Sequence, residues 1–175
     1  MRHGETEANI QNLLCGGDWD ANLTDKGIKQ AEDVASTIFS KISDIKTICT
    51  TPLIRAQKTA EIINKVLKLP LHIIPELTER SWGNITKQPM ELFEKFNQTN
   101  PFGAETLKNY DARIKEGLIK ALEFDTPVLI VAHSSVWRRI ADILSINISE
   151  IKIIKCATPY YIECDNKKWS MSEVK

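Results

Sequence analysis

The chain has 175 residues, 42% of them hydrophobic and 26% charged, with 23 basic side chains balancing 23 acidic ones. These values are typical of a globular domain, and the balanced charge argues against a broad basic surface for nucleic acid or anionic membranes. The longest apolar runs, such as PVLIVA, are far shorter than the roughly 20 residues that a membrane-spanning helix needs. We therefore expect one domain over residues 1–175, with neither nucleic acid nor a membrane as partner.

Hydrophobic periodicity predicts two helices and two short strands in the first half of the chain. Apolar residues recur at three- and four-residue steps over 25–42, which predicts a helix with Thr24 as its N-cap. A strand is predicted over 46–50, followed by a helix over 52–68 that starts at a proline and has Thr51 as its cap. The stretch LPLHIIPE, bounded by prolines, predicts a second strand.

The second half of the chain alternates strand and helix signals in the same way. Residues 75–104 look irregular and form a small cap segment, with one helix expected around MELFEKFNQ. A long helix is predicted over 105–124, PVLIVA predicts a strand buried on both faces, and a further helix is predicted over 136–144. PYYIEC and KKWSMSEV predict a closing antiparallel hairpin. We expect an α/β three-layer sandwich with a mostly parallel central sheet and helices on both faces.

Two histidines and two arginines fall at places where such a sheet binds ligands, beyond the carboxyl ends of its strands. Arg55 follows one predicted strand closely and His133 follows another directly, while Arg2 and His3 open the chain. Arginine offers planar donors for phosphate oxygens, and a neutral histidine is a competent nucleophile toward phosphorus near neutral pH. This pattern predicts an anion pocket for phosphate that contains an attacking histidine.

The cysteines favour a reducing compartment. Cys15, Cys49, Cys156 and Cys164 form no CxxC pair, so reduced thiols in a cytoplasmic protein are the preferred interpretation. A disulfide or a metal site is the alternative. The polar N-terminal stretch has no signal-peptide pattern.

Six segments occur in the order seen in the histidine phosphatase superfamily, which also contains cofactor-dependent phosphoglycerate mutases. They are RHGETEAN, LTDKGIKQA, TPLIRAQKTA, ELTERSWG, GAET and VLIVAHSSV, and the resemblance extends from residue 1 to about residue 140. It implies a phosphoglycerate mutase-like fold. It also implies no metal and no other cofactor, because arginines and a histidine would supply the positive charge that metals supply elsewhere.

The resemblance implies a role for each matching residue. His3 would be the nucleophile that becomes phosphohistidine, and Arg2 and Arg55 would bind the phosphoryl oxygens. His133 would donate a hydrogen bond to the same phosphoryl group. Glu79 in LTER would be the general acid that protonates the departing alkoxide.

Other positions leave alternatives open. Asn9 matches a polar contact on the phosphate side, and Gly17 falls where the family has a loop near the substrate. Glu105 in GAET would either contact ligand or cap the following helix, and Glu76 competes with Glu79 as the acid. His72 in LHII is better explained by a structural role. The tryptophans Trp19 and Trp82 would either line the pocket mouth or pack in the core.

Two features depart from the family pattern. Ser134 and Ser135 replace two glycines after His133, which predicts an altered loop geometry, with a serine able to cap the next helix. Family members also carry a short apolar strand, central in the sheet, directly before RHG, whereas here only Met1 precedes it. Because a sheet without its middle strand would leave ladder groups unpaired, we expect that residues upstream of Met1 are missing or that the start was assigned at an internal methionine.

The expected activity is hydrolysis of a small phosphorylated metabolite. Mutases of the superfamily carry longer insertions over the site, whereas the short segment 82–103 leaves the site open to water. In size and layout the chain resembles small phosphatases such as α-ribazole phosphatases. Phosphoglycerate mutase is the alternative, and a catalytically inactive module that binds a phosphate ligand or a protein is a further one. No motif names the substrate or the oligomeric state.

Overall fold

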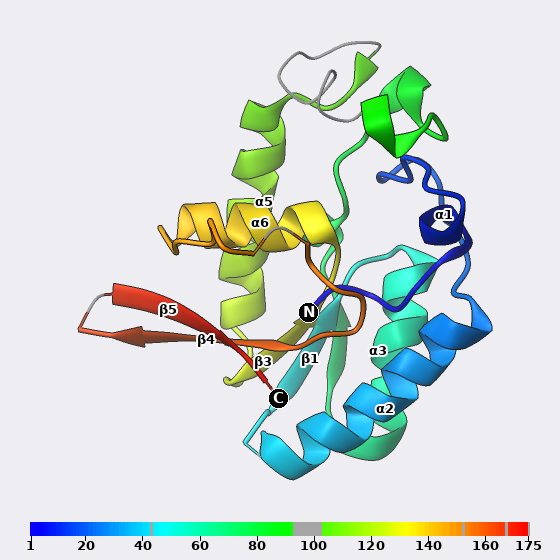
Figure 1. Ribbon diagram of the computed structural model, residues 1–175. Coiled ribbons are helices and arrows are strands. Elements are labelled where there is room, and N and C mark those ends of the chain that lie inside the picture. Colours follow the sequence, from blue (N-terminus) through cyan, green and yellow to red (C-terminus); the bar gives the residue numbers. More distant parts are fainter. Residues whose placement is uncertain (43, 93–102, 152, 167, 175) are drawn as a thin grey trace.

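A three-stranded parallel sheet forms the centre of the protein, for which a computed structural model describes residues 1–42, 44–92, 103–151, 153–166 and 168–174 (Figure 1). Its order is β2 (Leu71–Ile73), β1 (Thr47–Thr50), β3 (Val128–Val131). Ile48 of β1 lies opposite Leu71 on one side and Leu129 on the other. All four residues of β1 are buried, as expected for a central strand covered on both faces.

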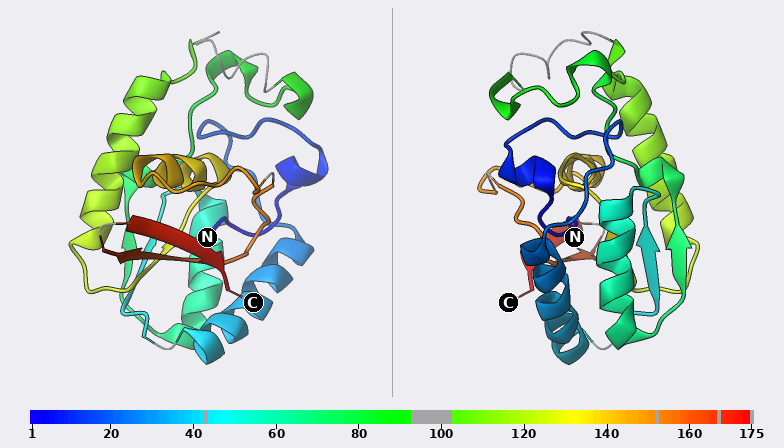
Figure 2. Two further views of the ribbon diagram at one scale, coloured as in Figure 1. Left: turned by 60° about the vertical axis from the view of Figure 1, so that its left-hand side comes forward. Right: turned by 90° about the vertical axis from the view of Figure 1, so that its right-hand side faces the viewer.

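Helices cover both faces of this sheet, so the predicted three-layer α/β sandwich is confirmed (Figure 2). On one face, α2 (Asp25–Lys41) and α3 (Ile54–Leu67) pack on Ile48 and on alternate residues of β3. On the other face, α5 (Leu107–Leu122) and α6 (Ser134–Ile143) pack on Cys49 and on the intervening positions of β3. The period-2 alternation of strand side chains thus divides the core into two halves.

The remaining elements lie outside these layers. The closing hairpin is antiparallel as predicted, with β4 (Tyr160–Asp165) paired to β5 (Lys168–Glu173). Sequence periodicity did not reveal one short helix, α1 (Glu7–Ile10), and three single turns of 3-10 helix. These turns are η1 (Pro75–Leu77), η2 (Gly83–Ile85) and η3 (Met90–Leu92). Of the helix expected around MELFEKFNQ, only the turn η3 falls within the described residues.

Residues 1–3 lie along the edge of β3 that faces away from β1. The amino group of Met1 donates to the carbonyl oxygen of Ile130 at 2.6 Å, and the amide of His3 donates to Ala132 at 3.0 Å. On the other side of Arg2, the amide of Ala157 donates to its carbonyl oxygen. Backbone hydrogen bonds on both sides therefore hold the Arg-His pair beside the carboxyl end of β3.

Three helix starts differ from the predicted ones. Helix α3 begins at Ile54 rather than residue 52, because the Asp20 carboxylate, not Thr51, caps it by accepting from the Ile54 amide at 2.9 and 3.0 Å. Helix α5 begins at Leu107 with Thr106 as its cap, and α6 begins at Ser134 with His133 in the N-cap position. Thr24 caps α2 as predicted. Within the described part of the chain, no helix is long and apolar enough to cross a bilayer.

Candidate active site

The ends of β1 and β3 bring two polar side chains into contact. These strands pair in register up to Thr50 and Val131, so Thr51 and His133, which follow, emerge at the same edge of the sheet. The Thr51 hydroxyl and the Nε2 atom of His133 are 2.8 Å apart, and both residues are fully buried. His133 is therefore fixed at the start of α6 by a side chain from the neighbouring strand.

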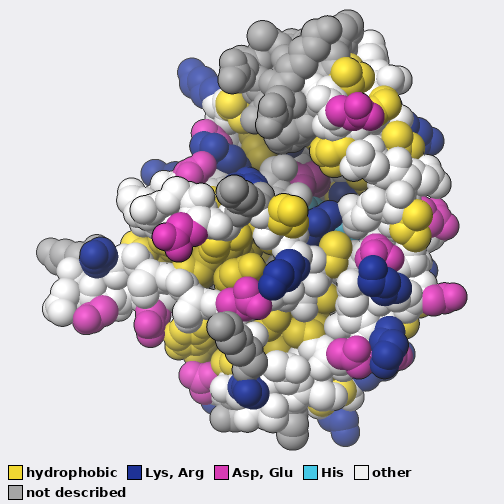
Figure 3. All heavy atoms as spheres, viewed as in Figure 1, with side chains coloured by type: hydrophobic (Ala, Val, Ile, Leu, Met, Phe, Trp, Pro, Cys, Tyr) yellow, Lys and Arg dark blue, Asp and Glu magenta, His cyan; other side chains and the backbone are white. Residues whose placement is uncertain are grey.

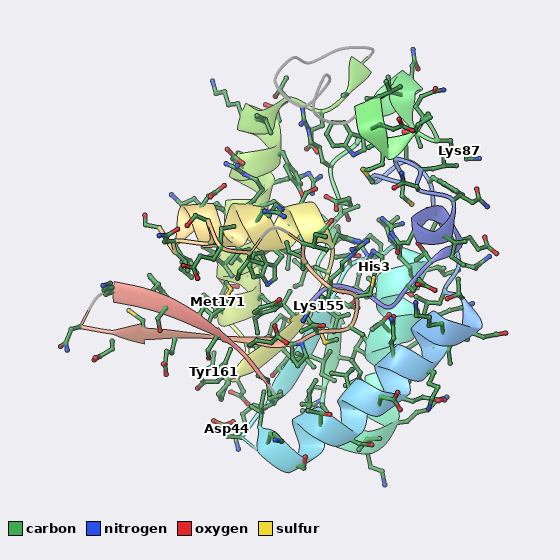
Figure 4. The ribbon with its side chains drawn as sticks, in the orientation of Figure 1. His3, Asp44, Lys87, Lys155, Tyr161 and Met171 are labelled. Atoms are coloured by element: carbon green, nitrogen blue, oxygen red, sulfur yellow. The ribbon has the colours of Figure 1, made fainter. Side chains whose placement is uncertain are left out.

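His3 lies beside His133, with the two ring centroids 5.3 Å apart and the rings inclined at 61°. Figure 4 shows His3 near the middle of the molecule, away from the hairpin residues Tyr161 and Met171. The Nδ1 atom of His3 is 2.7 Å from the carbonyl oxygen of Gly4. Because a carbonyl only accepts, Nδ1 must carry the proton, which leaves the lone pair of the neutral ring on Nε2.

Two arginines place positive charge next to this histidine pair. Arg55 is 1% exposed, and its Nη1 and Nη2 atoms donate to the carbonyl oxygens of Trp19 and Gly16. Arg2 donates from Nη1 to Ile154 at 3.0 Å. The Nε atoms of both arginines are buried and have no hydrogen-bond partner among the described residues. Buried guanidinium groups with unused donors are suited to bind an anion.

The same surroundings keep both imidazoles neutral. Burial, followed by the charges of Arg55 and Arg2, lowers the pKa of His3 well below its ordinary value of 6.5. Burial and then Arg55 likewise lower the pKa of His133. A buried ring held neutral keeps a lone pair available for attack near pH 7.

Glu79 lies at the amino end of α6, the helix that follows His133. One of its oxygens, Oε2, accepts from the backbone amide of Ser135 at 3.2 Å. The other, Oε1, accepts from the hydroxyl of Tyr110 and from the amide of Arg80, both at 2.9 Å. Glu79 is 7% exposed, and its carboxylate contacts the first turn of α6, for which His133 is the N-cap residue.

A single arginine of α5 fixes the loop that carries Glu79. Arg113 donates to the carbonyl oxygens of Glu76, Thr78 and Glu79. It also makes a bidentate ion pair with Glu105, with both N–O distances at 2.7 Å. Since planar guanidinium groups match carboxylates in two bonds at once, this arrangement fixes the loop relative to α5.

The remaining candidate residues have structural contacts of their own. The side-chain oxygen of Asn9 accepts from the amide and hydroxyl of Thr6 in a capping box at the start of α1. Gly17 donates to the carbonyl of Arg80, and a Cβ atom at Gly17 would lie 2.6 Å from the carbonyl oxygen of Glu79. Glu105 does not cap α5, since it pairs with Arg113. The roles of Asn9, Gly17 and Glu105 toward a ligand stay predictions.

The rival positions lie in other surroundings. Glu76 pairs with Lys120 at 2.6 Å. Glu79 instead contacts Ser135, two residues after His133, and this contact favours Glu79 over Glu76 as the acid. His72 stacks on Phe124 with ring centroids 3.9 Å apart, which agrees with a structural role. Trp82 is 3% exposed and packs with Leu14 in a small core cluster.

Three residues that organise this site are not among the predicted site residues. They are Thr51, which the sequence predicts as a helix cap, and Tyr110 and Arg113 of α5. Arg113 follows Tyr110 by three positions and therefore lies on the same, inward face of α5. An arginine at that position was the available signal, because a charge on a core-facing stripe requires partners.

His133 also lines an apolar cavity. This cavity of about 400 Å³ lies between β3 and the β4–β5 hairpin, with Met1, Leu129, Trp137 and Tyr161 among its lining residues. Figure 3 shows dark-blue, cyan and magenta side chains in a hollow near the centre of this face. Arg2, His3 and Arg55 are not among the described residues that line this cavity, so the unpaired arginine donors lie at the histidine pair and not in the cavity.

Comparisons with known proteins agree with this geometry. A family model described as histidine phosphatase superfamily (branch 1) matches residues 1–175. An uncharacterized phosphatase of Bacillus subtilis (strain 168), PhoE, is 37% identical over 138 residues, 77% of this chain and 70% of that protein. The adenosylcobalamin/α-ribazole phosphatase of Escherichia coli (strain K12) is 27% identical over 188 residues, 99% and 88% of the two chains. The crystal structure of an α-ribazole phosphatase from Shigella flexneri is similar with a TM-score of 0.79 at 25% identity, covering 99% of this chain and 93% of that one.

Proposed function

The chain belongs to the histidine phosphatase superfamily, and we propose that it hydrolyses the phosphomonoester of a small metabolite through a phosphohistidine formed on His3. The observation that carries this proposal is the buried imidazole pair, whose pKa values burial and the charges of Arg55 and Arg2 lower, with the His3 lone pair directed to Nε2 by the carbonyl of Gly4. No metal takes part in the proposed steps.

In the first half-reaction, the Nε2 lone pair of His3 forms a bond to phosphorus while the ester P–O bond breaks. The leaving oxygen takes the bond electrons and receives a proton from Glu79, which becomes a carboxylate. Arg2 and Arg55 would bind the phosphoryl oxygens through the transition state, in which negative charge spreads over them. If the Thr51 hydroxyl donates to Nε2 of His133, the Nδ1–H of that ring is available to donate to the same group.

In the second half-reaction, water gives a proton to the Glu79 carboxylate and its oxygen bonds to phosphorus. The P–N bond breaks, its electrons return to Nε2 of His3, and inorganic phosphate leaves. Glu79 thereby takes a proton from water that replaces the one it gave to the alcohol. A residue that alternates between acid and base in this way needs a fixed position next to both the leaving group and the water.

The substrate is proposed only as a class, a small phosphomonoester. The relatives named as α-ribazole phosphatases make α-ribazole phosphate one compound to test. A cytoplasmic location is supported by the four cysteines, all of which are unpaired.

The test compares wild type with His3→Ala on p-nitrophenyl phosphate, α-ribazole phosphate and 3-phosphoglycerate, the last with and without 2,3-bisphosphoglycerate. We expect wild type to release inorganic phosphate and to trap an acid-labile phosphoenzyme on rapid quenching, and His3→Ala to do neither. Rapid 2-phosphoglycerate formation with little free phosphate would instead identify a mutase. Absence of turnover and of a phosphoenzyme in wild type would identify an inactive binding module, and activity of His3→Ala would refute the nucleophile.

A further inference from the structure

The two oxygens of the Glu79 carboxylate have unequal surroundings. Oε1 accepts two hydrogen bonds, from the Tyr110 hydroxyl and the Arg80 amide, whereas Oε2 accepts one, from the Ser135 amide at 3.2 Å. A carboxylate oxygen has two lone pairs in the carboxyl plane. Both acceptor positions of Oε1 are therefore occupied, and a proton placed there would displace one of the two donors.

Tyr110 is held so that its hydroxyl keeps this contact. The residue is 1% exposed, lies in the first turn of α5, and has the Arg113 guanidinium 4.7 Å from the centre of its ring. Burial, followed by the negative charge of Glu79, raises the pKa of Tyr110 well above its ordinary value of 10. Tyr110 therefore remains protonated and can act only as a donor toward Glu79.

We propose that Tyr110 is a positioning residue that occupies Oε1 of Glu79 and so assigns proton transfer to Oε2, the oxygen that accepts from the Ser135 amide. The proposal rests on the function proposed above. During ester cleavage the Oε2–H bond breaks, and its proton bonds to the leaving oxygen as the P–O bond breaks. During hydrolysis of the phosphohistidine, Oε2 takes the proton from the attacking water. Tyr110 keeps its own proton in both steps.

The inference predicts that the Tyr110→Phe variant is selectively impaired on esters that need an acid. Phenol is a poor leaving group with a pKa of about 10, as for tyrosine, whereas p-nitrophenol is far more acidic and leaves without protonation. Without the Tyr110 donor, the Glu79 proton can reside on either oxygen and the carboxyl group can rotate. We therefore expect hydrolysis of phenyl phosphate to fall about tenfold or more, and that of p-nitrophenyl phosphate to change less than about threefold.

The readout is the ratio of phosphoenzyme formation rates for the two esters, measured by rapid quenching. This ratio does not depend on how much of the variant is folded, because both esters react with the same folded molecules. Tyr161→Phe is the matched control, since it removes a tyrosine hydroxyl from β4, away from His3 (Figure 4). We expect wild type and Tyr161→Phe to give the same ratio.

Equal losses on both esters in Tyr110→Phe, or no loss on either, would overturn the inference. These outcomes are separable from failure of the proposed function. If His3→Ala retains hydrolysis, the phosphohistidine route is wrong and the Tyr110 inference fails with it. If His3→Ala is inactive and Tyr110→Phe leaves the ratio unchanged, only the role of Tyr110 is refuted.

Discussion

Replacing Arg113 by methionine tests whether one side chain holds the Glu79 loop. The substitution removes a bidentate ion pair with Glu105 and the donors to the carbonyl oxygens of residues 76, 78 and 79. The side chains of the pair are 25% and 16% exposed, so the interaction lies between a surface pair, at 0.2–1 kcal/mol, and a buried pair whose loss costs 3–5 kcal/mol. We expect a loss of about 3 kcal/mol in the free energy of unfolding, or about 6–12 °C in Tm for a chain of this size.

Urea unfolding measures this loss, and Arg139→Met is the matched control. The side chain of Arg139 is 27% exposed and pairs with Asp111 and Asp142, whose side chains are more exposed than that of Glu105. These bonds go to carboxylates and not to backbone carbonyl oxygens. The control should lose less than about 1 kcal/mol. Arg113→Met should also lower hydrolysis of phenyl phosphate at least tenfold, because Glu79 is no longer fixed.

A double-mutant cycle with Glu105→Gln separates the ion pair from the carbonyl contacts. Once Arg113 is absent, neutralising Glu105 removes an uncompensated charge, so the double variant should be about 1.5 kcal/mol more stable than the sum of the single losses predicts. A loss below 1 kcal/mol for Arg113→Met, or strict additivity in the cycle, would refute the reasoning.

Two further predictions concern the histidines. Because the pKa values of His3 and His133 are lowered, the folded protein binds fewer protons than the unfolded chain around and below pH 6.5. Its free energy of unfolding therefore decreases as the pH is lowered. Between pH 7.5 and 5.5, urea titrations of His3→Gln should show a fall up to about 1.4 kcal/mol smaller than in wild type, and an equal or larger fall would contradict this origin. Thr51→Val should cost about 1–3 kcal/mol of stability and reduce kcat, because it leaves Nε2 of His133 without its partner, whereas Thr51→Ser should retain most of both; equal behaviour of the two variants would argue against the hydrogen bond.

The architecture followed from the sequence because each central element has a strong periodic pattern. The unbroken apolar run PVLIVA forms β3, and the alternation of strands with amphipathic helices gave the correct three-layer arrangement. Polar residues directly after buried strands predicted where His133 lies. Those signals are local, and parallel strands turn them into neighbours in space.

Long-range hydrogen bonding was not predictable from local patterns. Thr51 fits an N-cap by position, yet Asp20, from a loop distant in sequence, takes that role and leaves Thr51 to contact His133. Tyr110 reads as an apolar core residue, since nothing in its neighbourhood reveals that its hydroxyl meets Glu79. Such contacts depend on the crossing of separate segments, which hydrophobic periodicity does not encode.

The groups proposed to bind the phosphoryl oxygens come from separate stretches of chain: residues 2–3, Arg55 of α3 and His133 at the start of α6. Because only the complete fold brings these stretches together, we expect an oxyanion to bind the folded chain and not the unfolded one. Ligand binding and global unfolding are consequently linked. A ligand concentration of a hundred times Kd adds about 2.7 kcal/mol to the free energy of unfolding. A cell rich in the substrate would thereby shield this phosphatase from proteases that act on opened chains.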